Sequence, residues 1–316
     1  MFQLLNFKDT VQFMAFRGLF RWVSLILVVG SIAILSVNRL NWGLDFTGGT
    51  LVELGFEQPA DIPAIRTVLE ANNFADAVVQ HFGSSRDVVI RMTPRDGIDA
   101  AKVADDLVAG LRASDVGTFE LHRIDFIGPT IGAELRETGG LATLVALLCI
   151  LAYVTMRFEW RLALGAVAAL AHDVIITLGV FSLFKLEFDT TVLAAILAVI
   201  GYSLNDTIVV MDRIRENFRK VRKGEVEEII NISLTQTMSR TVITSLTTLL
   251  VLIALFYLGG ASIHGFATAL LCGVLVGTYS SIYVASTIAM GLGISREDLM
   301  PTEVEKEGAD QDPMMM

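Results

Sequence analysis

Six long apolar runs divide the chain, and one extended polar segment separates the first run from the other five. About 20 consecutive apolar residues are enough for a helix to cross the hydrocarbon core of a bilayer. The pattern therefore predicts transmembrane helices at 19–39, 138–157, 161–184, 189–212, 240–258 and 263–290. A signal peptide is the alternative for the first run, but that run is long and lacks a small-residue cleavage pattern after it. We expect an uncleaved span.

The polar segment, residues 40–132, predicts a small α+β domain. Alternating apolar and polar positions predict strands at Thr50–Glu57, Ala77–Phe82, Asp87–Met92 and Thr118–Phe126. Helical patterns lie between them at Asp61–Asn72, with Asp61 as N-cap, and at Ile98–Ala113. The order βαββαβ is that of a ferredoxin-like domain. The predicted fold class is a multi-pass α-helical membrane protein of six transmembrane helices, with this domain between helices 1 and 2.

Charge predicts the orientation of the chain in the membrane. Lysine and arginine gather in a basic loop predicted at 213–239, whereas the link between the last two runs has none. Because basic residues favour the cytoplasmic side, the N-terminal segment 1–18 and the C-terminal tail 293–316 are both expected in the cytoplasm. The domain at 40–132 is then periplasmic in a bacterium. The tail is acidic and low in β-branched and aromatic residues, so we expect it to be disordered.

Composition adds little to this picture. The chain is 53% hydrophobic with a mean hydropathy of +0.60, which excludes an ordinary soluble domain. Its net charge of −10 comes from the polar segments, because 45–126 carries 14 acidic and 7 basic residues, and 296–316 carries 7 and 2. This balance indicates no nucleic-acid partner. No catalytic constellation, cofactor motif or metal-ligand spacing stands out, so no enzyme, cofactor or metal is predicted.

Asp206 is the main candidate for function. It lies within the fourth apolar run, with no lysine or arginine within five residues on either side. An ionisable group at membrane depth is costly and is by default a functional candidate, although a carboxylate near a helix end that reaches water is the simpler alternative. Arg240 and Thr244 share a face of the following span, in the same half of the membrane. A proton carrier with a switching counter-charge and a permanent buried ion pair both remain open.

Other polar residues lie inside the predicted spans. His172 and Asp173 occur in the third span, and Ser203 and Asn205 precede Asp206 in the fourth. A proton relay and a set of satisfied interhelical hydrogen bonds explain such residues equally well. We leave this choice open.

The motif GLDFTGGT, residues 43–50, joins the first span to the polar domain. Asp45 followed by Gly48 and Gly49 allows a tight turn and a close approach of backbones, which indicates a hinge or junction. A phosphate-binding loop is excluded because the glycines precede a predicted strand and the lysine of that motif is missing.

Four motifs together resemble the SecD/SecF family of protein-export membrane proteins, and within it the smaller subunit. They are GLDFTGGT at 43–50, AHDVIITLG at 171–179, GYSLNDTIVVMDRIRENFR at 201–219 and TQTMSRTVITS at 235–245. The resemblance runs from about Phe13 to Met290 and also extends to the resistance-nodulation-division superfamily, whose transporters have two six-span halves.

The resemblance implies a function in the bacterial inner membrane. Such a subunit pairs with SecD and uses the proton motive force to help the SecYEG translocon move preproteins outward, with YajC and YidC as further partners. The proton path is implied to use the residues matching Asp206, Arg240 and Thr244, with a second acid supplied by SecD. Two alternatives remain: half of a proton-driven exporter of small molecules or lipids, and a scaffold of the translocon that conducts no protons.

Overall fold

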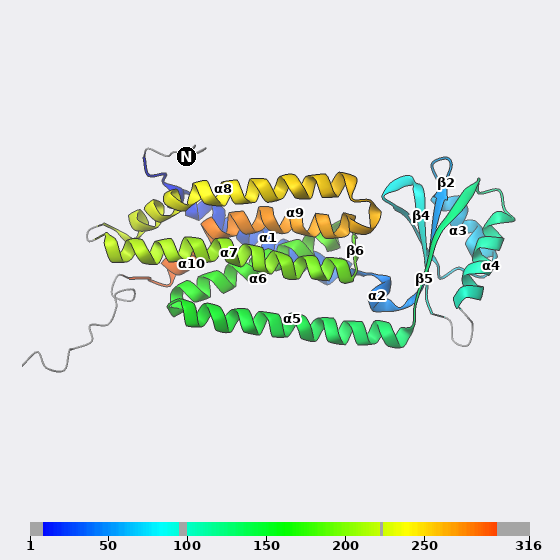
Figure 1. Cartoon of the computed structure of the whole chain (residues 1–316), viewed down its shortest axis with the longest axis horizontal. Coiled ribbons are helices and arrows are strands. Elements are labelled where there is room, and N and C mark those ends of the chain that lie inside the picture. Colours follow the sequence, from blue (N-terminus) through cyan, green and yellow to red (C-terminus); the bar gives the residue numbers. More distant parts are fainter. Residues whose placement is uncertain (1–8, 95–99, 222–223, 296–316) are drawn as a thin grey trace, which may run out of the picture.

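The computed structural model describes residues 9–94, 100–221 and 224–295. They form an elongated molecule, with a bundle of long helices and a small α+β domain at one end of it (Figure 1). The first residues of the segment 1–18, the predicted start of a helix at 98 and almost all of the tail 293–316 lie outside the described residues.

The bundle contains six helices that are long and apolar enough to cross a membrane, counted over the described residues. Its elements are η1 (Phe13–Phe16), α1 (Arg17–Asn38), α5 (Pro129–Arg157), α6 (Trp160–Leu183), α7 (Thr190–Lys220), α8 (Val226–Leu258), α9 (Ala261–Ser280), η2 (Ser281–Ala285) and α10 (Ser286–Gly291). Within the most apolar 18-residue window of each span, 56% of α6 and 44% of α7 lie buried inside the structure. The corresponding share is only 6% for the spans formed by α1 and α5. The helices α6 and α7 and the sixth span, which is 44% buried as well, are therefore central, and α1 and α5 expose most of their apolar surface.

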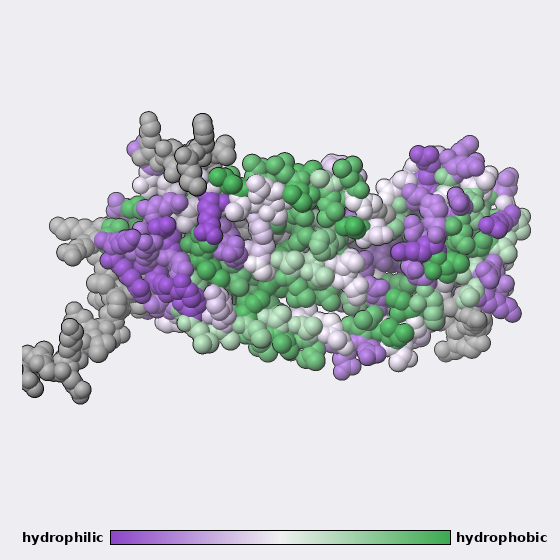
Figure 2. Space-filling model, viewed as in Figure 1, coloured by the Kyte–Doolittle hydropathy of each residue, from purple (hydrophilic) through white to green (hydrophobic). Residues whose placement is uncertain are grey.

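On the face shown in Figure 2, exposed apolar side chains form a band across the bundle, between two hydrophilic ends. One hydrophilic end is the α+β domain, and the other is the far end of the bundle, near α10 and the start of α8 (Figure 1). A band of this kind matches the hydrocarbon layer of a bilayer, where apolar side chains need no cover.

The α+β domain is connected to α1 by two short elements, β1 and α2. Its elements are β1 (Asn41–Trp42), α2 (Leu44–Thr47), β2 (Gly49–Phe56), α3 (Ile62–Ala71), β3 (Val78–Phe82), β4 (Ser84–Met92), α4 (Ala100–Arg112) and β5 (Phe119–Ile127). The antiparallel sheet has the order β3-β4-β2-β5. This is the ferredoxin-like order, so the predicted fold class is confirmed.

Alternation along β2 places two different layers on its faces. Val52, Leu54 and Phe56 pack with the two helices in the core of the domain, whereas Leu51 packs with Leu44 of α2 on the opposite face. Asp61 caps α3 as predicted, since its side chain accepts a hydrogen bond from the backbone N–H of Ala64 at 3.2 Å.

The structure corrects the predicted loop at 213–239. Helix α7 continues to Lys220 and α8 begins at Val226, so most of that segment is helical. Polar side chains stabilise these extensions: Glu216 forms ion pairs with Arg213 and Lys220 of the same helix. Asn217 of α7 donates to Ser233 of α8 at 2.9 Å. Apolar periodicity alone misses helices that continue beyond the membrane.

A second difference concerns the sixth span. A π-helical turn, η2, interrupts it at Ser281–Ala285. Such turns insert one extra residue and often mark functional positions, and no apolar pattern predicts them.

A buried carboxylate between three helices

The carboxylate of Asp206 lies inside the bundle, where three elements meet. The residue is 9% exposed on α7. The hydroxyl of Thr241 on α8 donates a hydrogen bond to Oδ1 at 2.6 Å, and the hydroxyl of Ser281 in η2 donates one to Oδ2 at 2.6 Å. Each oxygen therefore accepts a bond from a different neighbouring helix, which is an arrangement suited to a charged carboxylate in an apolar setting.

Arg240 and Thr244 do not contact Asp206 in this structure. Arg240 is exposed, and among the described residues it forms neither a hydrogen bond nor an ion pair with that carboxylate, although its charge acts on the carboxylate from a distance. The hydroxyl of Thr244 donates to backbone carbonyls of its own helix, those of Arg240 at 2.9 Å and Thr241 at 3.0 Å. Helix α8 does contact Asp206, but through Thr241 rather than through Arg240 or Thr244.

Sequence reasoning missed both hydroxyl partners of Asp206. Thr241 follows Arg240 directly, and a step of one residue turns a helix by about 100°. Ser281 belongs to a pair of serines, Ser280-Ser281, in an otherwise apolar run. That pair was the available signal, because adjacent hydroxyls inside a span require partners.

A second polar cluster surrounds Asp173 of α6, which is fully buried. Ser203 of α7 and Ser280 of α9 donate to its Oδ2 at 2.5 and 2.7 Å. His172 contacts Oδ1 through Nδ1 at 2.9 Å, although neighbouring residues on a helix point in different directions. Asn205 is exposed and takes no part in either cluster.

The GLDFTGGT motif joins the domain to the start of α7. Asp45 of α2 accepts two hydrogen bonds from Thr190, one from its hydroxyl and one from its backbone N–H at 2.9 Å. Thr190 is the first residue of α7, so the helix that carries Asp206 begins at this contact. The carboxylate also lies where the positive end of the helix dipole favours an anion.

The two glycines permit a close approach of backbone segments at this junction. Gly48 and Gly49 have φ angles of 69° and 128°, which disfavour other residues. A Cβ at Gly49 would lie 2.2 Å from the carbonyl oxygen of Met92, and one at Gly48 would lie 3.0 Å from the Cα of Pro129. The motif therefore brings β2, β4 and the start of α5 close together.

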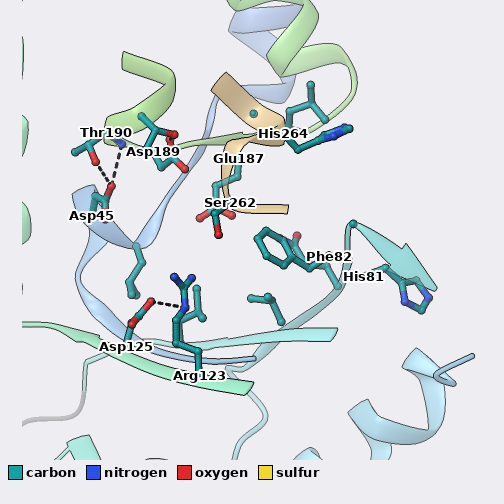
Figure 3. A pocket seen from close by; sticks show the side chains of 18 of the residues that line it. Asp45, His81, Phe82, Arg123, Asp125, Glu187, Asp189, Thr190, Ser262 and His264 are labelled. Atoms are coloured by element: carbon teal, nitrogen blue, oxygen red, sulfur yellow. Dashed lines mark hydrogen bonds and ion pairs between the residues drawn. The ribbon is translucent and has the colours of Figure 1, made fainter. Parts of the chain in front are cut away.

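A cavity of about 830 Å³ lies between the sheet of the domain and the adjacent end of the bundle (Figure 3). His81 and Phe82 line it from the domain, and Ser262 and His264 line it from α9. Figure 3 also shows the contact of Asp45 with Thr190 at its edge.

Glu187 lies in the wall of this cavity and bridges domain and bundle. It belongs to the short strand β6 (Glu187–Phe188), which pairs with β1 in parallel. Its carboxylate forms an ion pair with Arg91 of β4. Burial raises the pKa of the Glu187 carboxyl above its ordinary value of 4.5, and the Arg91 guanidinium acts against that rise.

Among the residues that the structure describes, no group of three or more histidines, cysteines or acids is placed to hold a metal ion. The two polar clusters of the bundle interior contain the carboxylates of Asp206 and Asp173, the imidazole of His172 and the hydroxyls that surround them.

Comparisons with known proteins agree on one family. The model for "Protein export membrane protein SecD/SecF, C-terminal" matches residues 108–294, and that for "SecD/SecF GG Motif" matches residues 33–60. Protein translocase subunit SecF of Vibrio alginolyticus is 59% identical over 314 residues, which cover 99% of this chain and 100% of that one. SecF of Pseudomonas aeruginosa is 48% identical and covers 98% of this chain and 100% of its own.

Solved structures show the same fold. The crystal structure of SecDF, a translocon-associated membrane protein from Thermus thermophilus, aligns with a TM-score of 0.81 at 37% identity. SecDF in a super-membrane-facing form aligns with a TM-score of 0.68 at 36% identity. The alignments cover 90% and 92% of this chain but only 39% of each SecDF chain, so this chain corresponds to about two fifths of SecDF.

The fold, the junction motif, the buried carboxylate and the near-complete alignment with translocase subunits lead to one conclusion. The chain is a multi-pass membrane protein that belongs to the SecD/SecF family of protein-export membrane proteins, in its SecF branch.

Proposed function

We propose that this chain forms a complex with a SecD subunit and uses the proton motive force to help the SecYEG translocon export preproteins across the bacterial inner membrane. One observation carries the proposal. Asp206 is an ionisable group inside the apolar bundle, held by hydroxyls from two neighbouring elements, on a helix that starts at the junction with the domain. YajC and YidC are further partners in this proposal.

The proposed orientation places both termini in the cytoplasm and the domain at 40–132 in the periplasm. Arg213, Arg215 and Lys220 lie on α7 beyond its apolar part, at the end remote from the domain. Basic residues next to a span favour the cytoplasm. The hydrophilic end near α10 in Figure 2 is then the cytoplasmic surface.

Protonation of Asp206 changes what its carboxyl group binds. The charged form accepts bonds from both Thr241 and Ser281, whereas the neutral acid carries a proton on one oxygen and no longer suits a donor there. One of the two contacts with α7 must then rearrange. Arg240 is proposed as the counter-charge that approaches the carboxylate when the proton leaves, because a guanidinium favours the charged form. Thr244, one turn further along α8, helps to orient the carboxyl group.

Helix α7 transmits this change to the domain. Thr190 and Asp206 are 16 residues apart on one helix, which is about 24 Å at 1.5 Å per residue. Asp45 binds Thr190 at the first turn of that helix. A movement of α7 is therefore transmitted to the GLDFTGGT junction. Each proton supplies about 2.3 kcal/mol per 100 mV of membrane potential. The second acid of the path is expected from SecD.

Proteoliposomes with the translocon and the full complex test the proposal, in sodium-free buffer so that protons are the only driving cation. Asp206→Asn is expected to remove both proton flux and the stimulation of export by the gradient. Asp45→Asn is expected to retain flux but lose most of the stimulation, because the contact with Thr190 is weakened. Asp189→Asn is the matched control, since Asp189 caps the same helix by accepting from the backbone N–H of Val192.

The same assay separates the alternatives. Unchanged flux and export in Asp206→Asn would contradict the proposal and favour a scaffold. Gradient-driven movement of a small molecule or lipid by the complex without translocon would instead indicate an exporter.

A further inference from the structure

Asp173 is the most deeply buried acid of the bundle, and its environment differs from that of a purely structural residue. It has no exposed surface, and α6 lies at the centre of the helices. Its bonds come from Ser203, Ser280 and His172, and no lysine or arginine forms an ion pair with it among the described residues. A carboxylate in this position is costly when charged unless hydrogen bonds or a proton compensate.

His172 supplies an unused basic nitrogen beside this carboxylate. The residue is 5% exposed, and its Nε2 is buried without a hydrogen-bond partner among the residues that the structure describes. With Nδ1–H donating to Oδ1 of Asp173, Nε2 carries a free lone pair. An unpaired buried acceptor is costly, and a proton bound at Nε2 would remove that cost.

The other titratable groups near the pair come from α9 and α7. The thiol of Cys272 forms a hydrogen bond with Thr177 of α6. The centroids of the Tyr279 and His172 rings are 6.0 Å apart. The Tyr279 hydroxyl is occupied by Ser24 and by the backbone carbonyl of Phe20. Asp206 of α7 is the acid of the neighbouring hydroxyl cluster.

Two short links connect Asp173 with Asp206. Ser280 donates to Asp173, and the next residue, Ser281, donates to Asp206. On α7, Ser203 and Asp206 are three residues apart, and Ser203 also donates to Asp173. The π-helical turn η2 begins at Ser281, so the serine pair lies where the backbone already departs from regular α-helix.

Glycines allow α6, α7 and α9 to approach this network. A Cβ at Gly277 of α9 would lie 3.1 Å from the Cβ of Ser203 and 3.5 Å from Oδ2 of Asp173. A Cβ at Gly165 of α6 would lie 2.7 Å from the carbonyl oxygen of Ala285 in η2. The π-helical turn is therefore packed directly against the helix that carries Asp173.

We propose that His172 and Asp173 form a second proton-holding site within this chain, coupled to Asp206 through the Ser280-Ser281 pair. The inference rests on the proposed function of Asp206 and deepens it. A proton binds Nε2 of His172, and the proton on Nδ1 passes to Oδ1 of Asp173. The result is a neutral acid beside a neutral imidazole, with one proton gained by the pair.

This uptake weakens the bonds to Oδ2, because a neutral carboxyl oxygen accepts more weakly than a carboxylate. Ser280 is released, and the adjacent Ser281 shifts with it relative to Asp206. Because the two acids also repel when both are charged, a proton on one changes the occupancy of the other. The chain then holds two coupled proton sites of its own, in addition to the acid expected from SecD.

The test uses the purified complex in lipid and records infrared difference spectra during a pH titration. In an Asp206→Asn background, a protonated-carboxyl band is expected to rise as pH falls, and Asp173→Asn added to that background is expected to remove it. Asp189→Asn in the same background is the control and is expected to keep the band. His172→Phe is expected to change the pH at which the band appears.

Proton flux gives the second readout. Asp173→Asn alone keeps the acceptor oxygen for Ser203 and Ser280, so the complex is expected to assemble normally while flux falls about tenfold or more, as for loss of a charged hydrogen-bonding group. Co-purification with the partner shows that the variant is folded. A band that persists without Asp173, or normal flux in Asp173→Asn, would overturn the inference.

The two proposals fail separately. Normal flux in Asp206→Asn would refute the role of Asp206, whereas the band that depends on Asp173 is measured with Asp206 already replaced. If Asp173→Asn fails to assemble, the spectra of His172→Phe decide: a band at unchanged pH contradicts a His172–Asp173 site.

Discussion

The direct hydrogen-bond partners of Asp206 are hydroxyl groups rather than a guanidinium. Hydroxyls of Thr241 and Ser281 stabilise the negative charge through direct bonds of 2.6 Å, but each can also rotate and accept a bond. An arginine in contact would hold the carboxylate permanently charged. Two rotatable partners suit a group that must exist in both protonation states.

Replacement of Thr241 by valine tests this environment directly. The change keeps the shape of the side chain and removes one bond to a charged group, which is worth about 1.5–3 kcal/mol. Proton flux is therefore expected to fall by a factor of about 10–100, measured in proteoliposomes with a pH-sensitive dye.

Thr247→Val is the matched control for that measurement. Thr247 is exposed, and its hydroxyl donates to the carbonyls of Ile243 and Thr244 on its own helix. Equal flux in the two valine variants would show that the bond from Thr241 has no role in handling the proton.

Helix α9 packs closely along α7, and glycine makes this contact possible. A Cβ at Gly273 would lie 2.2 and 2.5 Å from the two methyl groups of Val199. Valine is β-branched and has few rotamers in a helix, so it cannot move aside easily. The spacing Gly273-xxx-Gly277, visible in the sequence as a small-residue pattern, is therefore a contact surface for α7.

Gly273→Ala is expected to destabilise the bundle, by about 1–3 kcal/mol for an overpacked site. The melting temperature of the purified complex in detergent measures the effect. Gly201→Ala provides the comparison, because no atom lies within 4 Å of the point that a Cβ would occupy at this position of α7. Alanine there should preserve or raise stability, as it favours helix. A Gly273→Ala complex as stable as the Gly201→Ala complex would contradict tight packing at Gly273.

The domain and the bundle meet through a small set of polar contacts. Asp45 binds Thr190, β1 pairs with β6, and Arg91 forms an ion pair with Glu187. These contacts surround the cavity of about 830 Å³ and are few compared with the apolar cores on either side. Such an interface permits movement of the domain as a unit.

Glu187 makes this interface sensitive to pH. Its pKa is raised by burial, so its proton is held more tightly in the folded molecule than in the unfolded chain. The stabilisation is complete below the ordinary pKa of 4.5 and is lost as pH rises through the raised value. The folded protein is therefore less stable with Glu187 ionised than with Glu187 protonated.

Glu187→Gln removes this dependence. The melting temperature of the wild type minus that of the variant is expected to fall as pH rises from about 4.5 toward neutrality. The ion pair with Arg91 forms only with ionised Glu187, so it opposes this slope, and burial outweighs it in the net rise of the pKa. Glu57→Gln, at an exposed position of the same domain, is the matched control. A temperature difference that rises with pH would mean that the folded protein favours the ionised form of Glu187, contrary to this expectation.

The amino-acid sequence by itself determined the class of the molecule. Apolar runs, alternating strands and basic flanks act locally, through burial of side chains in lipid or in a small core, so they are visible as patterns. The same patterns identified Asp206 and the GLDFTGGT motif as exceptions that needed a function. They did not show that α7 and α8 continue beyond the membrane, where polar pairs rather than apolar burial support the helix.

Only the tertiary structure decided which side chains meet. Thr241 rather than Arg240 contacts Asp206 because one residue turns a helix by about 100°, and a π-helical turn sets the direction of Ser281. Asp173, Ser203 and Ser280 come from three helices, and Asp45 reaches Thr190 across 145 positions of chain. Such contacts depend on how helices pack in three dimensions, which periodicity along one helix does not encode.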